Sequence, residues 1–286
     1  MNQHRNSAPA ITARGVTKVY GSGDTAVHAL GGIDVDFGRG MFTAIMGPSG
    51  SGKSTLMHCL AGLDTVTGGQ VYLGDTEITK LGDTELTELR RERIGFVFQA
   101  FNLLPVLTAR ANMVLPMKLA GSEPEPAWMD QVVTTLGLSQ RLDHLPHELS
   151  GGQQQRVAVA RALLPQPDVI FADEPTGNLD SRSGTEVLGL LRTAVRESGQ
   201  TVVMVTHDPV AASYADRVVL IADGRTAGEI SGPTVDSVMA AMRGLGADDL
   251  APIGSSNAGS SNAGSSNAGS SNAGSRNAPQ PIGVYR

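Results

Sequence analysis

The stretch that most constrains what this chain can fold into is residues 47–55, which read GPSGSGKST. They fit the pattern of a phosphate-binding loop, in which a glycine, four variable residues and a second glycine precede Lys and Ser or Thr. Apolar runs at residues 41–46 and 56–60 predict a buried strand before the loop and a helix after it. Glycine lets backbone N–H groups turn toward phosphate oxygens, and the helix directs its positive end at the same point. The sequence therefore predicts a phosphate site between a strand and a helix.

The side chains of this loop have separate expected tasks. Lys53 brings a full positive charge to the β- and γ-phosphates of a nucleotide, and the Ser54 hydroxyl is placed to hold a magnesium ion. We expect the whole loop to contact the nucleotide, through Gly47, Pro48, Ser49, Gly50, Ser51, Gly52, Lys53, Ser54 and Thr55. The loop alone leaves kinases, GTPases and ATPases open as classes.

Charge and composition argue against a nucleic-acid binder, a disulfide-stabilised protein and a membrane-spanning protein. The 22 basic and 28 acidic residues give a net charge of −6, which argues against a general nucleic-acid binder. The single cysteine, Cys59, rules out a disulfide framework, and its place in the helix after the loop favours a small buried thiol. No apolar run reaches the roughly 18 to 20 residues of a spanning helix, and residues 1–10 lack the apolar segment of a secretion signal. We expect a cytoplasmic protein that meets a membrane only through a partner.

Short apolar runs alternate with helical patterns, which predicts an α/β fold with a largely parallel core sheet. Strands are expected at residues 11–20, 27–37, 71–73, 94–99, 169–172, 202–205 and 218–222, and helices at 86–93, 127–136, 153–164 and 185–197. Prolines break the helical pattern repeatedly after residue 100, which indicates an inserted helical subdomain at about residues 100–164.

The two ends of the chain differ from its middle. From Gly254 the unit Gly-Ser-Ser-Asn-Ala occurs four times, and a fifth copy, Gly-Ser-Arg-Asn-Ala, ends at Ala278. This composition buries almost no apolar surface, so a disordered tail is expected. We predict one folded domain at residues 11–245, between a flexible N-terminus at residues 1–10 and a disordered repeat tail at 246–286.

Two adjacent carboxylates, Asp173 and Glu174, follow a buried strand at residues 169–172. Ligands of open parallel sheets sit at the carboxyl ends of the strands. Adjacent side chains of a strand point in opposite directions, so the two groups have different tasks. Asp173 is the candidate for holding magnesium, and Glu174 is the candidate for polarising the water that attacks the γ-phosphate.

A second anion site is predicted where Ser150-Gly151-Gly152-Gln153 begins another helix. One nucleotide does not obviously need two such anion sites.

Two other clusters of charged residues are explained without a metal or a nucleic acid. Pro146 interrupts any helix that would bring Asp143, His144, His147 and Glu148 together as metal ligands, and the basic run at residues 90–93 fits a solvated helix face better than a nucleic-acid patch.

Taken together, the motifs resemble those of the nucleotide-binding subunit of an ABC transporter. The resemblance rests on residues 47–55, Gln99, LSGGQQQR at 149–156, VIFADEP at 169–175 and His207, and it covers about residues 11–232. It implies the ABC cassette fold, with a mostly parallel core sheet, an N-terminal antiparallel β subdomain and the inserted helical subdomain. It also implies an ATPase that uses ATP and Mg²⁺.

The resemblance implies a role for each matching residue. In such proteins two subunits close head to tail, so that Ser150, Gly151, Gly152 and Gln153 of one chain meet the γ-phosphate held by the other. Tyr20 matches the aromatic residue that stacks on adenine. Gln99 matches the glutamine that reaches magnesium and the attacking water, and His207 the histidine that contacts the γ-phosphate and orders Glu174. Asp180 lies in the loop that crosses the dimer interface.

The sequences at residues 95–105 and 176–180 are similar to the branch of lipoprotein-releasing, macrolide- and peptide-exporting and cell-division ATPases. The expected partners are a second copy of the chain and a permease with few spanning helices and a large extracytoplasmic domain. The apolar side chains of Phe101, Leu103 and Leu104 are expected in the groove that receives the permease.

Two alternatives belong to other classes. A soluble ABC-type ATPase acting on ribosomes or DNA is disfavoured because translation-type relatives carry two cassettes and repair-type relatives carry long coiled coils. A small-molecule phosphotransferase does not account for the helix start at Ser150.

Overall fold

The computed structural model describes residues 8–247. The repeat tail and most of the expected flexible N-terminus lie outside these residues. The strands are β1 (Ile11–Tyr20), β2 (Val27–Phe37), β3 (Phe42–Met46), β4 (Gly68–Leu73), β5 (Thr76–Glu77), β6 (Ile94–Phe98), β7 (Val169–Asp173), β8 (Val202–Val205), β9 (Arg217–Ala222) and β10 (Arg225–Ser231). The helices are α1 (Lys53–Leu60), α2 (Asp83–Arg93), α3 (Ala109–Leu119), α4 (Pro126–Thr135), α5 (Gly151–Leu163), α6 (Ser181–Ser198), α7 (Pro209–Ala212) and α8 (Val235–Ala247).

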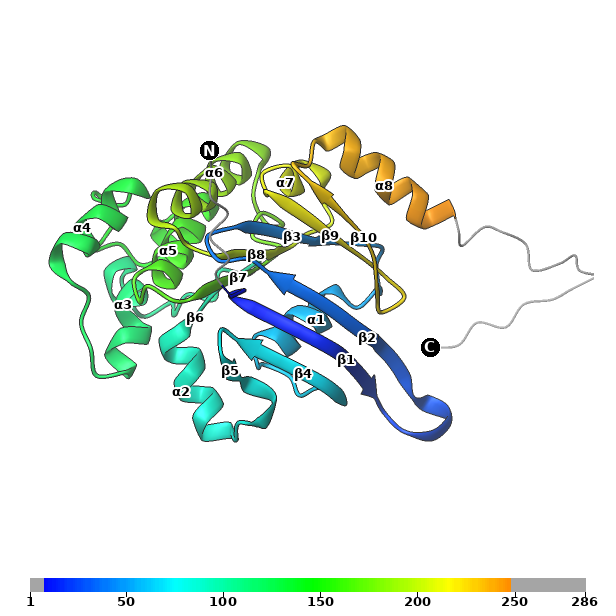
Figure 1. Cartoon of the computed structure of the whole chain (residues 1–286). Coiled ribbons are helices and arrows are strands. Elements are labelled where there is room, and N and C mark those ends of the chain that lie inside the picture. The colour runs from blue at the N-terminus through cyan, green and yellow to red at the C-terminus, as the bar shows by residue number, and fades with distance from the viewer. Residues whose placement is uncertain (1–7, 248–286) are drawn as a thin grey trace, which may run out of the picture. The chain divides into compact units, whose positions relative to one another are not determined.

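The strands form two sheets (Figure 1). One is antiparallel, with four strands in the order β2-β1-β4-β5. The other has six strands in the order β10-β9-β3-β8-β7-β6, in which all neighbours from β9 to β6 are parallel and β10 pairs with β9 antiparallel. The predicted α/β class, with its largely parallel core sheet, is confirmed.

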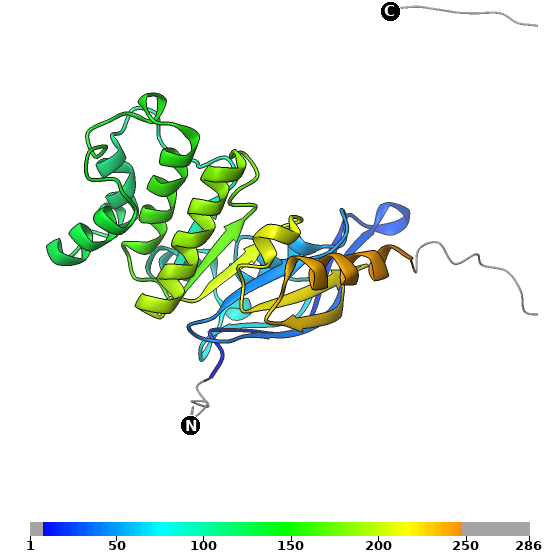
Figure 2. The ribbon, with the colours of Figure 1, turned by 90° about the horizontal axis from the view of Figure 1, so that it is seen from above.

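Both faces of the six-stranded sheet are covered, because its central strands alternate between two cores. Phe42, Ala44 and Met46 of β3 pack into a cluster with α3, α4, α5 and α6, whereas Ile45 packs into a second cluster with α1 and the antiparallel sheet. Strands that are buried on both faces are continuous apolar runs, which is why the sequence showed them plainly. Figure 2 shows the helices of residues 109–163, in green, gathered at one end of the sheet.

The parallel order of the strands determines where the loops meet. In a parallel sheet all carboxyl ends lie at one edge. The loops that follow β3, β8, β7 and β6 therefore line the same edge, although they are far apart in the sequence. This edge carries most of the predicted site residues.

Several elements escaped sequence reasoning. Strand β10 alternates between exposed and half-buried residues and buries none of them fully, so it lacks the apolar signal of a core strand. Helix α8 packs against the rest through Val238, which is completely buried, and a few half-buried neighbours. Helix α6 starts at Ser181, four residues before the predicted start, because Asp180 caps it.

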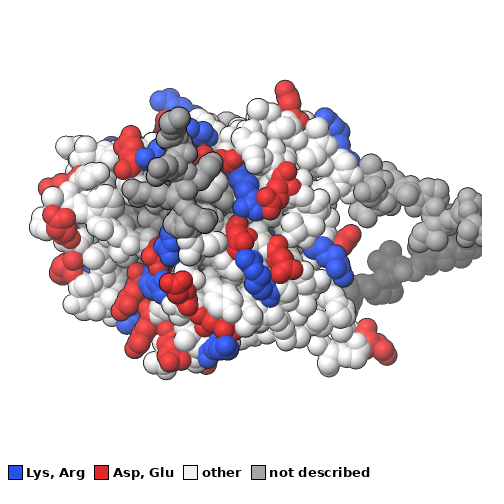
Figure 3. All heavy atoms as spheres, viewed as in Figure 1, with Lys and Arg blue, Asp and Glu red and all other residues white. Residues whose placement is uncertain are grey.

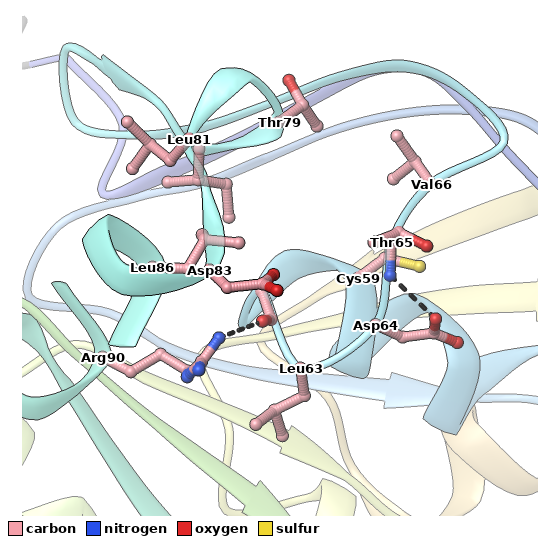
Figure 4. Close-up of a pocket in the computed structure, with 12 residues that line it drawn as sticks. Cys59, Leu63, Asp64, Thr65, Val66, Thr79, Leu81, Asp83, Leu86 and Arg90 are labelled. Carbon is pink, nitrogen blue, oxygen red and sulfur yellow. Dashed lines mark hydrogen bonds between the residues drawn. The ribbon is translucent and has the colours of Figure 1, made fainter. Parts of the chain in front are cut away.

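The basic run at residues 90–93 is not simply a solvated face, so that expectation was partly wrong. Arg90 lines a pocket of about 260 Å³ and donates to the carbonyl oxygen of Gly62 at 2.5 Å (Figure 4). Arg93 forms an ion pair with Asp168 at 2.7 Å. Residues three apart share one side of a helix, so both arginines turn inward while Arg91 stays exposed.

Opposite charges are interspersed on the face seen in Figure 3. Ion pairs join neighbouring strands, as between Arg14 and Asp36 at 2.7 Å and between Arg217 and Glu229.

Within residues 8–247, none of the helices combines the length and the apolar character that a membrane span requires.

Candidate active site

The phosphate loop joins β3 to α1 and is shaped by close backbone approaches. A Cβ atom at Gly47 would lie 1.9 Å from the carbonyl oxygen of Ile221, and one at Gly52 would lie 2.4 Å from that of Ala29. Gly50 and Gly52 have φ values of 79° and 97°, in the left-handed region that glycine adopts without strain. The loop therefore needs glycine at these positions for its own geometry.

The loop offers an anion several unsatisfied groups. Among the hydrogen bonds of residues 8–247, none uses the backbone N–H of Gly52, Lys53 or Ser54, and the buried hydroxyl of Ser51 has no partner. The Lys53 ammonium donates to the carbonyl oxygen of Pro48 at 2.7 Å. Burial lowers the pKa of Lys53 below its ordinary value, and the nearby Glu174 offsets part of this effect. These features fit the polyphosphate of a nucleotide.

The acidic pair lies at the carboxyl end of β7, two strands away from the loop. Asp173 is the last residue of the strand and is half-buried. Burial raises its pKa, a shift that His58 of α1 opposes and Glu174 increases. Glu174 has left the strand conformation, with φ of +46°. Such strain in a non-glycine residue is typical of functional sites.

Residues after β8 hold the Glu174 carboxylate. Nδ1 of His207 lies 2.8 Å from one carboxylate oxygen, and the hydroxyl of Thr206 donates to the other at 3.2 Å. The His207 side chain is 76% exposed whereas that of Glu174 is only 19% exposed. The histidine therefore faces the solvent side of the glutamate, where a ligand would arrive.

Gln99 follows β6 and contacts the loop that follows the acidic pair. Its side-chain amide donates to Asn178 at 3.1 Å, and the Asn178 amide donates back to the Gln99 carbonyl oxygen at 3.0 Å. Gly177 leaves room for this contact, since a Cβ there would lie 2.8 Å from the Gln99 amide nitrogen. The structure thus brings Gln99 to the loop after β7 and holds it there through Asn178, a residue that sequence reasoning missed.

The second predicted anion site is the start of α5. Ser150 caps the helix in a reciprocal arrangement: its hydroxyl accepts from the Gln153 N–H at 3.3 Å, and the Gln153 side chain accepts from the Ser150 N–H at 3.0 Å. Within residues 8–247, no hydrogen bond or ion pair joins this segment to the phosphate loop. The structure therefore shows two separate helix starts that are suited to an anion.

Helix α6 begins beside the start of α5. Asp180 accepts from the N–H groups of Arg182 and Ser183, and these bonds, chiefly those from Ser183, lower its pKa. A Cβ at Gly152 would lie 2.9 Å from the Ser183 hydroxyl oxygen, so the glycine permits the contact between the two helix starts.

A second residue of this region that was not predicted from the sequence is Gln155. It is fully buried and donates to the carbonyl oxygens of Phe98 and Pro175, which links α5 to the ends of β6 and β7.

Tyr20 is the last residue of β1, and its side chain is partly exposed. Its hydroxyl donates to Asp64 at 2.6 Å, and the Lys18 ammonium lies 4.8 Å from the centroid of its ring. Within residues 8–247, no three His, Cys, Asp or Glu side chains gather as metal ligands, the residues around His144 included. There Glu148 accepts from the Leu145 N–H instead.

The fold and this edge of the sheet define a phosphate-loop nucleotide-binding protein of the α/β class. Comparison with known proteins identifies the family. The ABC transporter family matches residues 30–177. The chain therefore belongs to the ABC transporter family, and it is an ATPase cassette.

Three proteins of similar sequence support the assignment to the ABC transporter family. The macrolide export ATP-binding/permease protein MacB of Marinobacter nauticus is 49% identical over 218 residues, which are 76% of this chain and 34% of that protein. The uncharacterized ABC transporter ATP-binding protein MJ1508 of Methanocaldococcus jannaschii is 45% identical and is matched over 75% of this chain and 96% of its own length. The bacitracin export ATP-binding protein BceA of Halalkalibacterium halodurans is 43% identical, over 75% and 86% respectively. The chain thus spans about a third of the MacB proteins and most of the other two.

A solved structure shares the fold. The dimeric ATP-binding cassette MJ0796, in a post-hydrolysis state bound to ADP and Pi, is 40% identical with a TM-score of 0.70, over 78% of this chain and 99% of that one. The predicted family, the ABC cassette fold and the ATPase activity are confirmed.

Proposed function

We propose that two copies of this chain close head to tail around two ATP molecules and that ATP hydrolysis drives a membrane permease of the exporter type. The observation that carries the proposal is the start of α5, which is built like an anion site yet has no link to the phosphate loop of its own chain. A second copy of the chain would supply the helix start that completes the phosphate site. The dimeric state of MJ0796 and the export names of MacB and BceA support the same reading.

The nucleotide would be held from its two ends. Lys53 and the N–H groups that begin α1 bind the β- and γ-phosphates, and Tyr20 stacks on the adenine ring. Ser54, Gln99 and Asp173 are the residues that would hold magnesium, which when bound supplies positive charge beside the phosphate oxygens. The bond from Gln99 to Asn178 uses the amide nitrogen, so it does not engage the amide oxygen, which is the atom that would hold a metal.

Glu174 is proposed as the general base. It accepts a proton from the attacking water as the oxygen of that water forms a bond to the γ-phosphorus and the bond to the β-phosphate oxygen breaks. Thr206 and His207 orient the carboxylate, and His207 contacts the γ-phosphate from the exposed side. Ser150 and Gly152 of the second copy close the site, and Asp180 lies at the interface.

A groove beside the helical insertion is proposed as the permease contact. It encloses about 330 Å³ and is lined by apolar and basic residues that include Phe96, Phe98 and Pro116. Phe101, Leu103 and Leu104, which were predicted for this contact, are not among the residues that line the groove; Leu104 is 46% exposed, while Leu103 packs against the core. An amphipathic helix of a permease would have to reach beyond the groove to bury Leu104 as well. Attachment through this groove would place the chain on the cytoplasmic face of the membrane.

The test is Glu174→Gln. We expect the variant to bind ATP with unchanged affinity, to hydrolyse it at least about 100-fold more slowly, and to run as an ATP-dependent dimer on a sizing column. Glu229→Gln is the matched control, because Glu229 of the edge strand β10 pairs with Arg217 at the amino end of β9, whereas the site lies at the carboxyl ends of the strands. Undiminished turnover would refute the role of Glu174. If the chain were isolated from solubilised membranes together with ribosomes instead of a permease, the proposed permease partner would be refuted.

A further inference from the structure

Tyr20 is held by a network of charged side chains. Lys18 and Tyr20 are two residues apart on β1, so their side chains lie on the same face of the strand. Both reach Asp64, in the connection between α1 and β4: the Lys18 ammonium donates to one carboxylate oxygen at 2.6 Å and the Tyr20 hydroxyl donates to the other at 2.6 Å. Asp64 therefore uses both oxygens to hold the tyrosine and its neighbour.

The network covers one face of the Tyr20 ring. The Lys18 ammonium lies 4.8 Å from the ring centroid, over one face. Lys18 is only 7% exposed and also donates to the Thr65 carbonyl oxygen at 2.6 Å, so it has little freedom to move away. Tyr20 itself is 40% exposed. The tyrosine is thus held in place and still partly accessible to a ligand.

Asp64 is in turn attached to the helix that binds phosphate. Its N–H and that of Leu63 donate to the carbonyl oxygen of His58, in the last turns of α1. The Thr65 N–H donates to the Asp64 carboxylate at 2.7 Å, which fixes the side chain at the edge of the pocket seen in Figure 4. One helix therefore carries Lys53 at its start and the anchor of Tyr20 just after its end.

We infer that Asp64 is a positioning residue for the nucleotide base: with Lys18 it holds the Tyr20 ring in its stacking orientation before ATP arrives. The inference rests on the proposed role of Tyr20 as the adenine platform. Fixing a side chain in advance removes the entropy cost of ordering it on binding, so the anchor raises affinity for ligands that contain the base and for no others.

The experiment compares ADP, which contains the base, with inorganic pyrophosphate, which does not, in equilibrium titrations of the full chain with magnesium. We expect Tyr20→Phe, which keeps the ring but loses the hydroxyl, to weaken ADP binding roughly three- to tenfold and to leave pyrophosphate binding unchanged. Asp64→Asn should have a similar effect on ADP. Tyr20→Ala, which removes the platform, should weaken ADP binding further.

A matched control removes an equivalent bond elsewhere. Tyr72→Phe loses a hydrogen bond to the Glu77 carboxylate on the same antiparallel sheet, away from Asp64, and should bind both ligands like the wild type. Wild-type ADP affinity in Tyr20→Phe, with weakened binding in Tyr20→Ala, would overturn the anchor but keep the platform. Wild-type affinity in Tyr20→Ala would overturn the platform itself. An equal loss for ADP and pyrophosphate in Tyr20→Phe would show a general distortion and would also overturn the inference.

Discussion

The chain has two helix starts that are suited to an anion, and they are built in opposite ways. The start of α1 has Gly52 in the capping position with no side-chain cap, and its first N–H groups donate to no protein atom within residues 8–247. The start of α5 is closed on itself by Ser150 and Gln153. An uncapped helix start costs stability unless a ligand satisfies it.

The difference fits the proposed dimer. In that dimer the α1 start would bind the phosphates of the nucleotide held by its own chain, and its unpaired N–H groups would donate to them. The α5 start would meet a phosphate only when a second copy closes, and until then the capping box satisfies it. Closure would replace a weak intramolecular bond of Ser150 by a bond to a charged phosphate, which is the stronger partner.

The largest effect is expected from a substitution that disturbs the close backbone approach in the phosphate loop, just before α1. Gly47→Ala places a Cβ 1.9 Å from the Ile221 carbonyl oxygen, so the strand or the loop must move. We expect a loss of about 3 kcal/mol or more in the free energy of unfolding, measured by denaturant titration, together with loss of ATP binding. Gly50→Ala is the control: no atom lies within 4 Å of its Cβ, and its positive φ alone costs about 1 kcal/mol. Equal losses for the two variants would contradict the account of Gly47.

Much of this edge of the sheet was predictable from the sequence, and the reason is topological. Lys53, Glu174, His207 and Gln99 each follow an apolar run. Parallel strands bring their carboxyl ends together whatever the distance along the chain. The strand runs were themselves clear because both faces of each strand are buried.

What sequence reasoning missed are the side-chain pairs between distant segments. Gln99 and Asn178 are 79 residues apart, and Tyr20 and Asp64 are 44 apart. Such pairs depend on how loops pack, and neither residue type nor local spacing reveals them. The left-handed conformation of Glu174 was hidden for a similar reason, since tertiary contacts impose it against the preference of the residue.

A smaller effect is expected at the second start. Ser150→Ala removes the hydroxyl that caps α5, which should lower the free energy of unfolding by about 1 kcal/mol. ATP binding to the monomer should not change, because the phosphate loop is separate. In the Glu174→Gln background the ATP-dependent dimer should weaken, as seen by a lower dimer fraction on a sizing column. A dimer of unchanged affinity would remove the α5 start from the interface and break the contrast between the two sites.

The smallest effect concerns the interior of α1, where Cys59 is buried. Burial raises the pKa of the Cys59 thiol to about 11, so its thiolate fraction at neutral pH is about 100-fold below that of a free thiol. Alkylation should therefore be slow below pH 11 and should become fast on unfolding. ATP should slow it further, because a ligand that binds only the folded state reduces opening of α1. Ser150→Ala should leave the protection by ATP intact, since the α5 start takes no part in binding by one copy; a loss of protection in that variant would show that the two helix starts are coupled within a single chain.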